Sequence, residues 1–403
     1  MPAPLVRLFI ATVLINGAYD AARVAISYRV LALGGDAVAV GLVASSFALL
    51  PMLVALSFGR LVDRRGSWGV LGAGAAVSAA AVALAAVSPT IAVLAAANAA
   101  MGLGQVMTLI GAQGFVMELT ERSRHVNGFA MFTLAVSVGQ TLGTPAMGLL
   151  LRSGRGDDGT VATGPGLAVM AVAIAVALPF CLSLPRNARR SGQASRAAAA
   201  SMPALVRRTG MVPSIFAALI VVTGFDLITA YMPVVGESVG LSALTVSLLV
   251  ATRSIFSMIS RAAMPLVLRR ASQRAILIAS PVVTTPAVLV LGLSGEAAVL
   301  WGCLAVIGFF WGMNQPVTMN WVTAAAPSGD RAAALSLRLT GNRAAQVLIP
   351  LGAGALAGVA GPGSVFLLSG ALTATSAVTT TTSLHRHPFA ELDSPTPRTR
   401  RDT

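Results

Sequence analysis

Long apolar stretches, separated by short polar segments, repeat along the whole chain. A helix that crosses the hydrocarbon core of a bilayer needs roughly 20 consecutive apolar residues. The first stretch is too long for the apolar region of a removable signal peptide, so we expect it to be a span. The pattern predicts twelve membrane-spanning helices, at 5–31, 38–58, 69–87, 91–117, 128–151, 164–184, 212–235, 241–264, 275–293, 297–325, 332–357 and 364–384.

Composition supports an all-α membrane protein. Hydrophobic residues make up 56% of the chain and charged residues only 10%, whereas soluble domains carry about 25% charged residues. Every basic residue apart from histidine is an arginine. The absence of lysine excludes a P-loop ATPase, whose lysine binds the nucleotide phosphates. Cys181 and Cys303 lack the spacing of a metal site, so we expect no metal and no cofactor.

The arginines also predict the topology. Polar segments that follow one another along the chain lie on opposite sides of the membrane, and the arginines concentrate on one side. On the other side, the loops between spans carry only Arg152 and Arg155. Because cytoplasmic loops are enriched in arginine, both termini and the basic linker 185–211 are expected in the cytoplasm, and the protein in the cytoplasmic membrane. Although the net charge is +14, this dispersed pattern does not suggest a nucleic-acid partner.

The two halves of the chain resemble each other. Residues 9–20, which end in Gly-Ala-Tyr-Asp, match residues 216–226, which end in Gly-Phe-Asp, and other matches share a similar offset. Internal repeats are typical of secondary transporters, whose substrate site lies at the repeat interface. We therefore expect two pseudo-symmetric six-helix bundles, at 1–184 and 212–384, followed by a disordered cytoplasmic tail at 385–403.

The segment after the second span carries a recognisable motif. Residues 59–66 read Gly-Arg-Leu-Val-Asp-Arg-Arg-Gly, which resembles the G-x-L-x-D-R-x-G signature of the major facilitator superfamily. The resemblance implies the fold of that family, transport by alternating access, and a gating role for Gly59, Asp63, Arg64 and Gly66. The alternative is a basic loop that only orients the protein in the membrane.

The fifth predicted span contains a second motif, formed by Gly139, Gly143, Pro145 and Gly148. It resembles the glycine–proline motif of antiporters in the same family, and ordinary packing through small residues is the alternative. Asn98 stands where the drug antiporters carry an arginine, which argues against drug–proton exchange by the usual route.

Ionisable residues within spans are costly, so they are candidates for function. Asp20 and Arg23 are three residues apart and share a helix face. Asp226, Arg253 and Arg343 are expected at similar depth, as coupling and substrate groups or as structural ion pairs. Arg29, Arg261 and Arg338 lie nearer the span ends and are expected to reach the membrane surface. Further polar candidates are Asn98, Gln105, Gln113, Asn314, Gln315 and Asn342.

These features predict a transporter rather than an enzyme. The leading hypothesis is proton-coupled efflux of a small organic molecule by a monomer surrounded by membrane lipid. The alternatives are uptake of an anionic metabolite by proton symport and, from another class, a membrane sensor or enzyme on a transporter scaffold. Asp20 and Asp226 are the candidate proton carriers, and an anionic group of the substrate is expected at Arg253 or Arg343.

Overall fold

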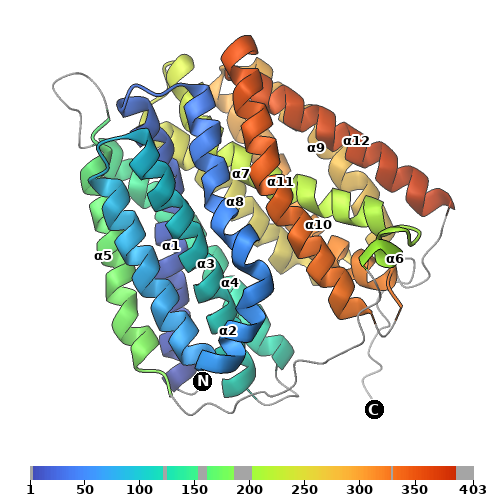
Figure 1. Ribbon diagram of the computed structural model, residues 1–403. Helices are drawn as coiled ribbons and strands as arrows, with labels where there is room; N and C mark the ends of the chain where they lie inside the picture. Colours follow the sequence, from blue (N-terminus) through green and yellow to red (C-terminus); the bar gives the residue numbers. More distant parts are fainter. Residues whose placement is uncertain (1–2, 121–124, 153–160, 186–201, 328–329, 387–403) are drawn as a thin grey trace. The chain divides into compact units, whose positions relative to one another are not determined.

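The structure is a computed structural model in which 3–120, 125–152, 161–185, 202–327 and 330–386 are described, except for the side chains of 54–66, 125–127, 202–203 and 332. These residues form twelve helices (Figure 1). They are α1 (Ala3–Ala32), α2 (Ala37–Ala86), α3 (Ile91–Leu119), α4 (His125–Arg152), α5 (Thr163–Leu182), α6 (Met202–Val206), α7 (Met211–Ser238), α8 (Ala243–Val267), α9 (Gln273–Leu293), α10 (Ala297–Ala324), α11 (Arg331–Ala360) and α12 (Ser364–Arg386).

The helices confirm an all-α membrane fold. Among the described residues, 11 segments are long and apolar enough to cross a membrane, and Ala37–Leu53 is a shorter apolar helix. The sequence predicted a loop between the second and third spans, and the backbone there is helical, so that both spans belong to α2. Its two apolar parts, Ala37–Leu53 and Ser67–Ala86, form two legs that run in opposite directions (Figure 1).

The chain forms two compact units. Unit 1 consists of Met1–Ser195, Asp226–Ser254 and Gln346–Val365, and unit 2 consists of Arg196–Phe225, Ile255–Ala345 and Phe366–Thr403. Helices α7, α8 and α11 therefore each contribute one part to unit 1 and another part to unit 2. The division into bundles at 1–184 and 212–384 follows the order of the chain and stays a prediction about its repeats.

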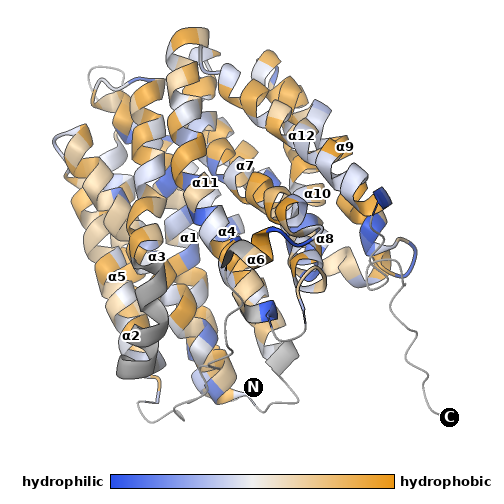
Figure 2. Cartoon of the chain, turned by 45° about the vertical axis from the view of Figure 1, so that its right-hand side comes forward, coloured by the Kyte–Doolittle hydropathy of each residue, from blue (hydrophilic) through white to orange (hydrophobic). Residues whose placement is uncertain are grey.

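Apolar residues dominate the helices of both units (Figure 2). Large apolar side chains are exposed on them, for example Leu142 and Val172 in unit 1 and Leu293 and Leu339 in unit 2. Soluble proteins do not usually expose so much contiguous apolar surface. Such faces require lipid as their solvent.

In unit 1, α1 packs closely against α4. A Cβ atom added at Gly143 would collide with the carbonyl group of Gly17, and one added at Gly139 would lie 2.9 Å from the amide nitrogen of Gly17. Glycine lets two helix backbones approach where any larger residue would hold them apart. This contact fixes the position of the following turn of α1, which carries Asp20 and Arg23.

A second close contact in unit 1 joins the start of α2 to α11. The Tyr231 hydroxyl of α7 donates to the carbonyl oxygen of Ala37 at 3.1 Å and lies 3.4 Å from that of Pro350. A Cβ atom added at Gly354 would lie 3.2 Å from the Cα atom of Gly41. These contacts tie parts of α7 and α11 to the N-terminal helices.

The core of unit 2 gathers around Trp321 of α10. Trp321 is fully buried and packs with Ala217, Ile276, Met313 and other apolar residues of α7, α9 and α10. On the same helix, the indole of Trp311 donates to the Thr284 hydroxyl at 3.0 Å and packs edge-on against Phe225. Both tryptophans therefore belong to the buried core of unit 2.

Candidate functional site

Asp20 of α1 lies in the interior of unit 1, opposite an arginine of α8. Its Oδ2 atom is 3.7 Å from Nη2 of Arg253, and both side chains are buried. Nη1 of Arg253 also donates to the Thr229 hydroxyl at 3.0 Å, and Nη2 to the Ser254 hydroxyl at 3.1 Å. Asp20 Oδ2 accepts no hydrogen bond from any residue that the structure describes.

Arg23, one turn further along α1, pairs with an aspartate of α7. Nη2 of Arg23 lies 2.7 Å from Oδ1 of Asp226, and Nε2 of Gln346 donates to Oδ2 of the same carboxylate at 2.5 Å. The guanidinium of Arg23 also lies over the ring of Phe47, 4.7 Å from its centre, where the face of the ring attracts a cation. Asp226 is thus held on both oxygens, in contrast to Asp20.

These two ion pairs form a set that we call the charge quartet: Asp20, Arg23, Asp226 and Arg253. Asp20 and Arg23 do not pair with each other along α1 but with separate helices, so the pairs cross. The quartet contains two acids and two bases and is neutral when all four are ionised. Buried charges are tolerated only when they are compensated in this way. The sequence expected Arg343 at a similar depth; Arg343 belongs to unit 2, so its place beside these residues stays a prediction.

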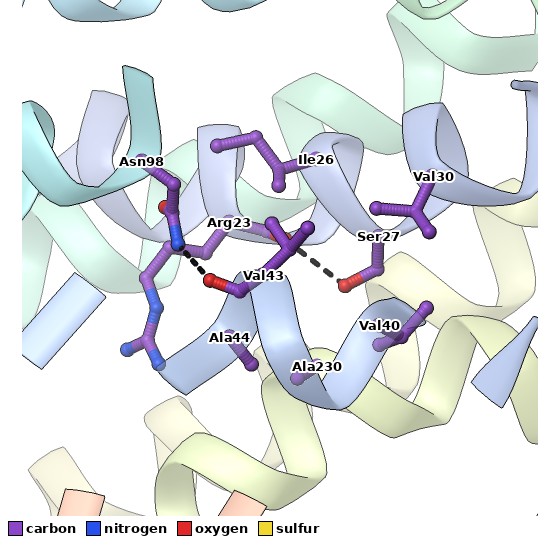
Figure 3. A pocket seen from close by; sticks show the side chains of 9 residues that line it. All are labelled: Arg23, Ile26, Ser27, Val30, Val40, Val43, Ala44, Asn98 and Ala230. Carbon is purple, nitrogen blue, oxygen red and sulfur yellow. Dashed lines mark hydrogen bonds between the residues drawn. The ribbon is translucent and has the colours of Figure 1, made fainter. Parts of the chain in front are cut away.

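A small cavity in unit 1 extends from the quartet (Figure 3). Within it, Nδ2 of Asn98 donates to the carbonyl oxygen of Val43 at 2.6 Å. Oδ1 of Asn98 is buried and has no hydrogen-bond partner among the described residues. The lining is otherwise mostly apolar and comprises Arg23, Ile26, Ser27, Val30, Val40, Val43, Ala44, Asn98 and Ala230.

The remaining polar candidates lie on α3, α10 and α11. Gln105 and Gln113 are half-buried on α3. In unit 2, Asn314 and Asn342 are buried, and neither Oδ1 atom finds a hydrogen-bond donor within the part of the chain that the structure describes. Arg343 is half-buried on α11. Gln315 accepts a hydrogen bond from an arginine of α8.

That arginine, Arg261, was expected to reach the membrane surface, as was Arg338. Instead, Nη2 of Arg261 donates to Oε1 of Gln315 at 3.1 Å. Nη2 of Arg338 lies 3.4 Å from the backbone oxygen of Gln315 and 3.5 Å from the hydroxyl of Thr318. Both side chains therefore turn toward α10, because partners on a neighbouring helix compete with the membrane surface for a guanidinium.

The two sequence motifs differ in what the structure describes of them. The side chains of the proposed gate, Gly59, Asp63, Arg64 and Gly66, lie outside the described residues. The glycine–proline motif lies in α4, with Pro145 inside the helix. Gly139 and Gly143 face α1, and a Cβ atom added at Gly148 would lie 2.6 Å from Cβ of Ser247.

The sequence analysis missed two residues that contact the quartet. Gln346 follows Arg343 by three residues on α11, and Thr229 follows Asp226 by three residues on α7. Residues at these spacings share a helix face. A search for polar residues one turn away from each ionisable candidate would have found both.

Comparison with known proteins identifies the family. A family model described as Major Facilitator Superfamily matches residues 8–328 and, in a second match, residues 214–401. The chain belongs to the major facilitator superfamily. The resemblance seen at residues 59–66 is thereby confirmed for the whole chain. No curated protein matches the sequence.

Solved structures of transporters share the fold of this superfamily member. The nucleoside transporter NupG is 14% identical with a TM-score of 0.79, over 95% of this chain and 99% of NupG. A bacterial homologue of the human lysosomal transporter Spinster, inward-facing and occupied, is 13% identical with a TM-score of 0.75, over 97% and 98% of the two chains. A D-xylose–proton symporter is 14% identical with a TM-score of 0.75, over 93% and 96%. At such identities the likeness concerns the fold alone.

Proposed function

We propose that the protein is a secondary transporter that moves a small organic molecule by alternating access, coupled to protons at the charge quartet. The crossed ion pairs of the quartet carry this proposal. Burying an acid within the spans costs free energy even when an arginine pairs with it. Exchange of a proton at such an acid would give the buried charge a role in transport. Membership of a transporter family supports the general activity.

We assign the uptake and release of the coupling proton to Asp20. Its ion pair with Arg253 is long, at 3.7 Å, and its Oδ2 atom accepts no hydrogen bond from the described residues. Asp226, in contrast, accepts from both Arg23 and Gln346. Protonation therefore breaks fewer favourable contacts at Asp20. Arg253 keeps its hydroxyl partners when Asp20 is neutral, so its position is maintained.

Different features of the chain favour the two possible directions of transport, export and uptake. Export in exchange for protons is the direction that the glycine–proline motif of α4 favours. Uptake by proton symport is favoured by charge balance, because protonated Asp20 leaves the quartet with an excess positive charge. An anionic substrate that travels with the proton offsets that charge, which reduces the cost of crossing the membrane interior.

Proton movement in proteoliposomes tests the proposal. Members of a small-molecule panel are added outside, and a trapped pH-sensitive dye reports the lumen. Acidification indicates symport, and alkalinisation indicates exchange. Asp20→Asn is expected to abolish the pH change while substrate counterflow continues without a gradient. Glu296→Gln, which neutralises an exposed acid outside the spans, serves as the matched control. A full pH response in Asp20→Asn contradicts the assignment.

We further propose that the protein is a monomer in the cytoplasmic membrane, with both termini and the linker 185–211 in the cytoplasm. The arginine distribution supports this orientation. In a background without Cys181 and Cys303, a membrane-impermeant thiol reagent added to whole cells is expected to label Gly159→Cys but not Ser195→Cys. Labelling of Ser195→Cys in intact cells contradicts the topology.

A further inference from the structure

Two helices of unit 2 each bring an arginine to one glutamine on a third helix. Arg261 of α8 donates to the side-chain oxygen of Gln315 on α10 at 3.1 Å. Arg338 of α11 approaches the backbone oxygen of the same residue at 3.4 Å and the Thr318 hydroxyl, one turn further, at 3.5 Å. Two guanidinium groups from different helices thus converge on a single turn of α10.

No acidic residue occurs in the stretches of α7–α12 that belong to unit 2, although they carry Arg261, Arg338 and Arg343. The neutral oxygens of Gln315 and Thr318 accept hydrogen bonds but supply no negative charge. An anion bound between the two guanidinium groups would interact strongly with them, since the low local dielectric of a partly buried site strengthens such attraction.

Arg338 also has an unfulfilled donor. Its Nε atom is buried and has no hydrogen-bond partner among the residues that the structure describes. A buried donor without an acceptor is costly, so this Nε atom would favour an acceptor such as a water or a ligand oxygen. The planar guanidinium presents Nε and an Nη atom side by side, which is the geometry that binds a carboxylate or phosphate through two oxygens.

We propose that Arg261, Gln315, Thr318 and Arg338 form a binding site for an anionic oxygen group, a carboxylate or a phosphate. Resting on the proposed transport function, this site gives the class of cargo as a small organic anion. It is an alternative to the expectation that Arg253 or Arg343 holds the anion, and it differs from the Arg253 site in that Arg253 already pairs with the carboxylate of Asp20. The headgroup of an anionic lipid offers the same chemistry, so the two sources must be separated.

Thermal stability of the purified full-length protein measures this binding directly. Inorganic phosphate and acetate are titrated at constant ionic strength in neutral-lipid nanodiscs, and the apparent melting temperature is recorded. The wild type is expected to show a saturable rise, as any ligand that binds only the folded state produces. Arg338→Gln is expected to raise the half-saturating concentration about tenfold or more, because a charge-assisted contact is lost.

Two further variants exclude trivial explanations. Arg338→Lys keeps the charge but not the planar donor pair, so it is expected to bind with intermediate affinity. Arg207→Gln removes the same charge from an exposed position in unit 2 and is expected to titrate like the wild type. Equal titrations for Arg338→Gln and Arg207→Gln, or no saturable response in the wild type, overturn the proposal.

A parallel arm replaces the neutral lipid with anionic lipid. If the soluble anions stabilise the protein in neutral nanodiscs, the site takes a cargo anion. If only anionic lipid stabilises it, and Arg338→Gln loses that effect, the ligand is a headgroup and the assignment to cargo is overturned. Neither arm depends on proton movement. A failure of the anion site is therefore distinguishable from a failure of Asp20 as the proton carrier.

Discussion

Units 1 and 2 differ in the charged residues that their span segments contain. Unit 1 matches each arginine of the charge quartet with an aspartate, at 2.7 Å and 3.7 Å, whereas the span segments of unit 2 hold arginines and no acids. A neutral set of charges is stable without a ligand, and protonation disturbs it. A set of arginines on helices without acids gains an opposite charge when an anion binds. The contrast suggests that one unit carries the proton and the other binds the anionic group.

The largest expected effect comes from breaking the stronger ion pair of unit 1. Arg23→Met leaves Asp226 as a buried charge with only Gln346 as a described partner, and removal of one member of a buried pair costs about 3–5 kcal/mol. The apparent melting temperature in detergent should fall steeply. The double variant Arg23→Met with Asp226→Leu removes both charges and should recover most of the loss. A mild effect of Arg23→Met alone would show that the pair is solvated.

A smaller effect is expected from the glycine contact that positions α1. In Gly143→Ala the new methyl group meets the Gly17 carbonyl, so α1 and α4 must separate, at a cost of about 1–3 kcal/mol. Gly302→Ala in unit 2 meets nothing within 4 Å and should be neutral or stabilising by up to about 1 kcal/mol. Similar melting temperatures for the two variants would contradict the close contact.

The membrane spans and the family were predictable from sequence, because lipid imposes a minimum apolar length and the motif at residues 59–66 is specific. The helical backbone between the second and third spans was not, since this polar segment reads as a loop. Spacing placed Asp20 and Arg23 on one face of α1, as i and i+3 always are. It gave no information about which helix lies opposite, so the crossed partners emerged only from the structure.

The arginines of unit 2 show the same limit. Arg261 and Arg338 lie near the predicted span ends, and residue counting favoured the membrane surface as their destination. The structure instead directs them to Gln315, because helix packing decides which acceptors come within reach of a long side chain. The sequence predicts how far along a helix a residue lies. Which neighbouring helix its side chain faces depends on how the helices pack.

Tyr231→Phe tests a hydroxyl that links parts of α7 and α11 to the N-terminal helices within unit 1. The change removes the hydrogen bond to the Ala37 carbonyl and should cost about 0.5–1.5 kcal/mol. Tyr28→Phe is the matched control, because the buried Tyr28 hydroxyl has no hydrogen-bond partner among the described residues. Its loss should leave the melting temperature unchanged or slightly higher. Equal losses in the two variants would remove the assigned role of Tyr231.

The smallest effect is expected from the substitution that most directly compares the two units. Arg338→Met makes in unit 2 the same change that Arg23→Met makes in unit 1. Arg338 has only neutral described partners, at 3.4 and 3.5 Å, and its removal eliminates a buried unsatisfied donor. Without added anions, stability should therefore change by less than about 1 kcal/mol, since no opposite charge is left unpaired. A loss as large as that of Arg23→Met would mean that a carboxylate outside the described residues compensates Arg338, and the contrast between the units would fail.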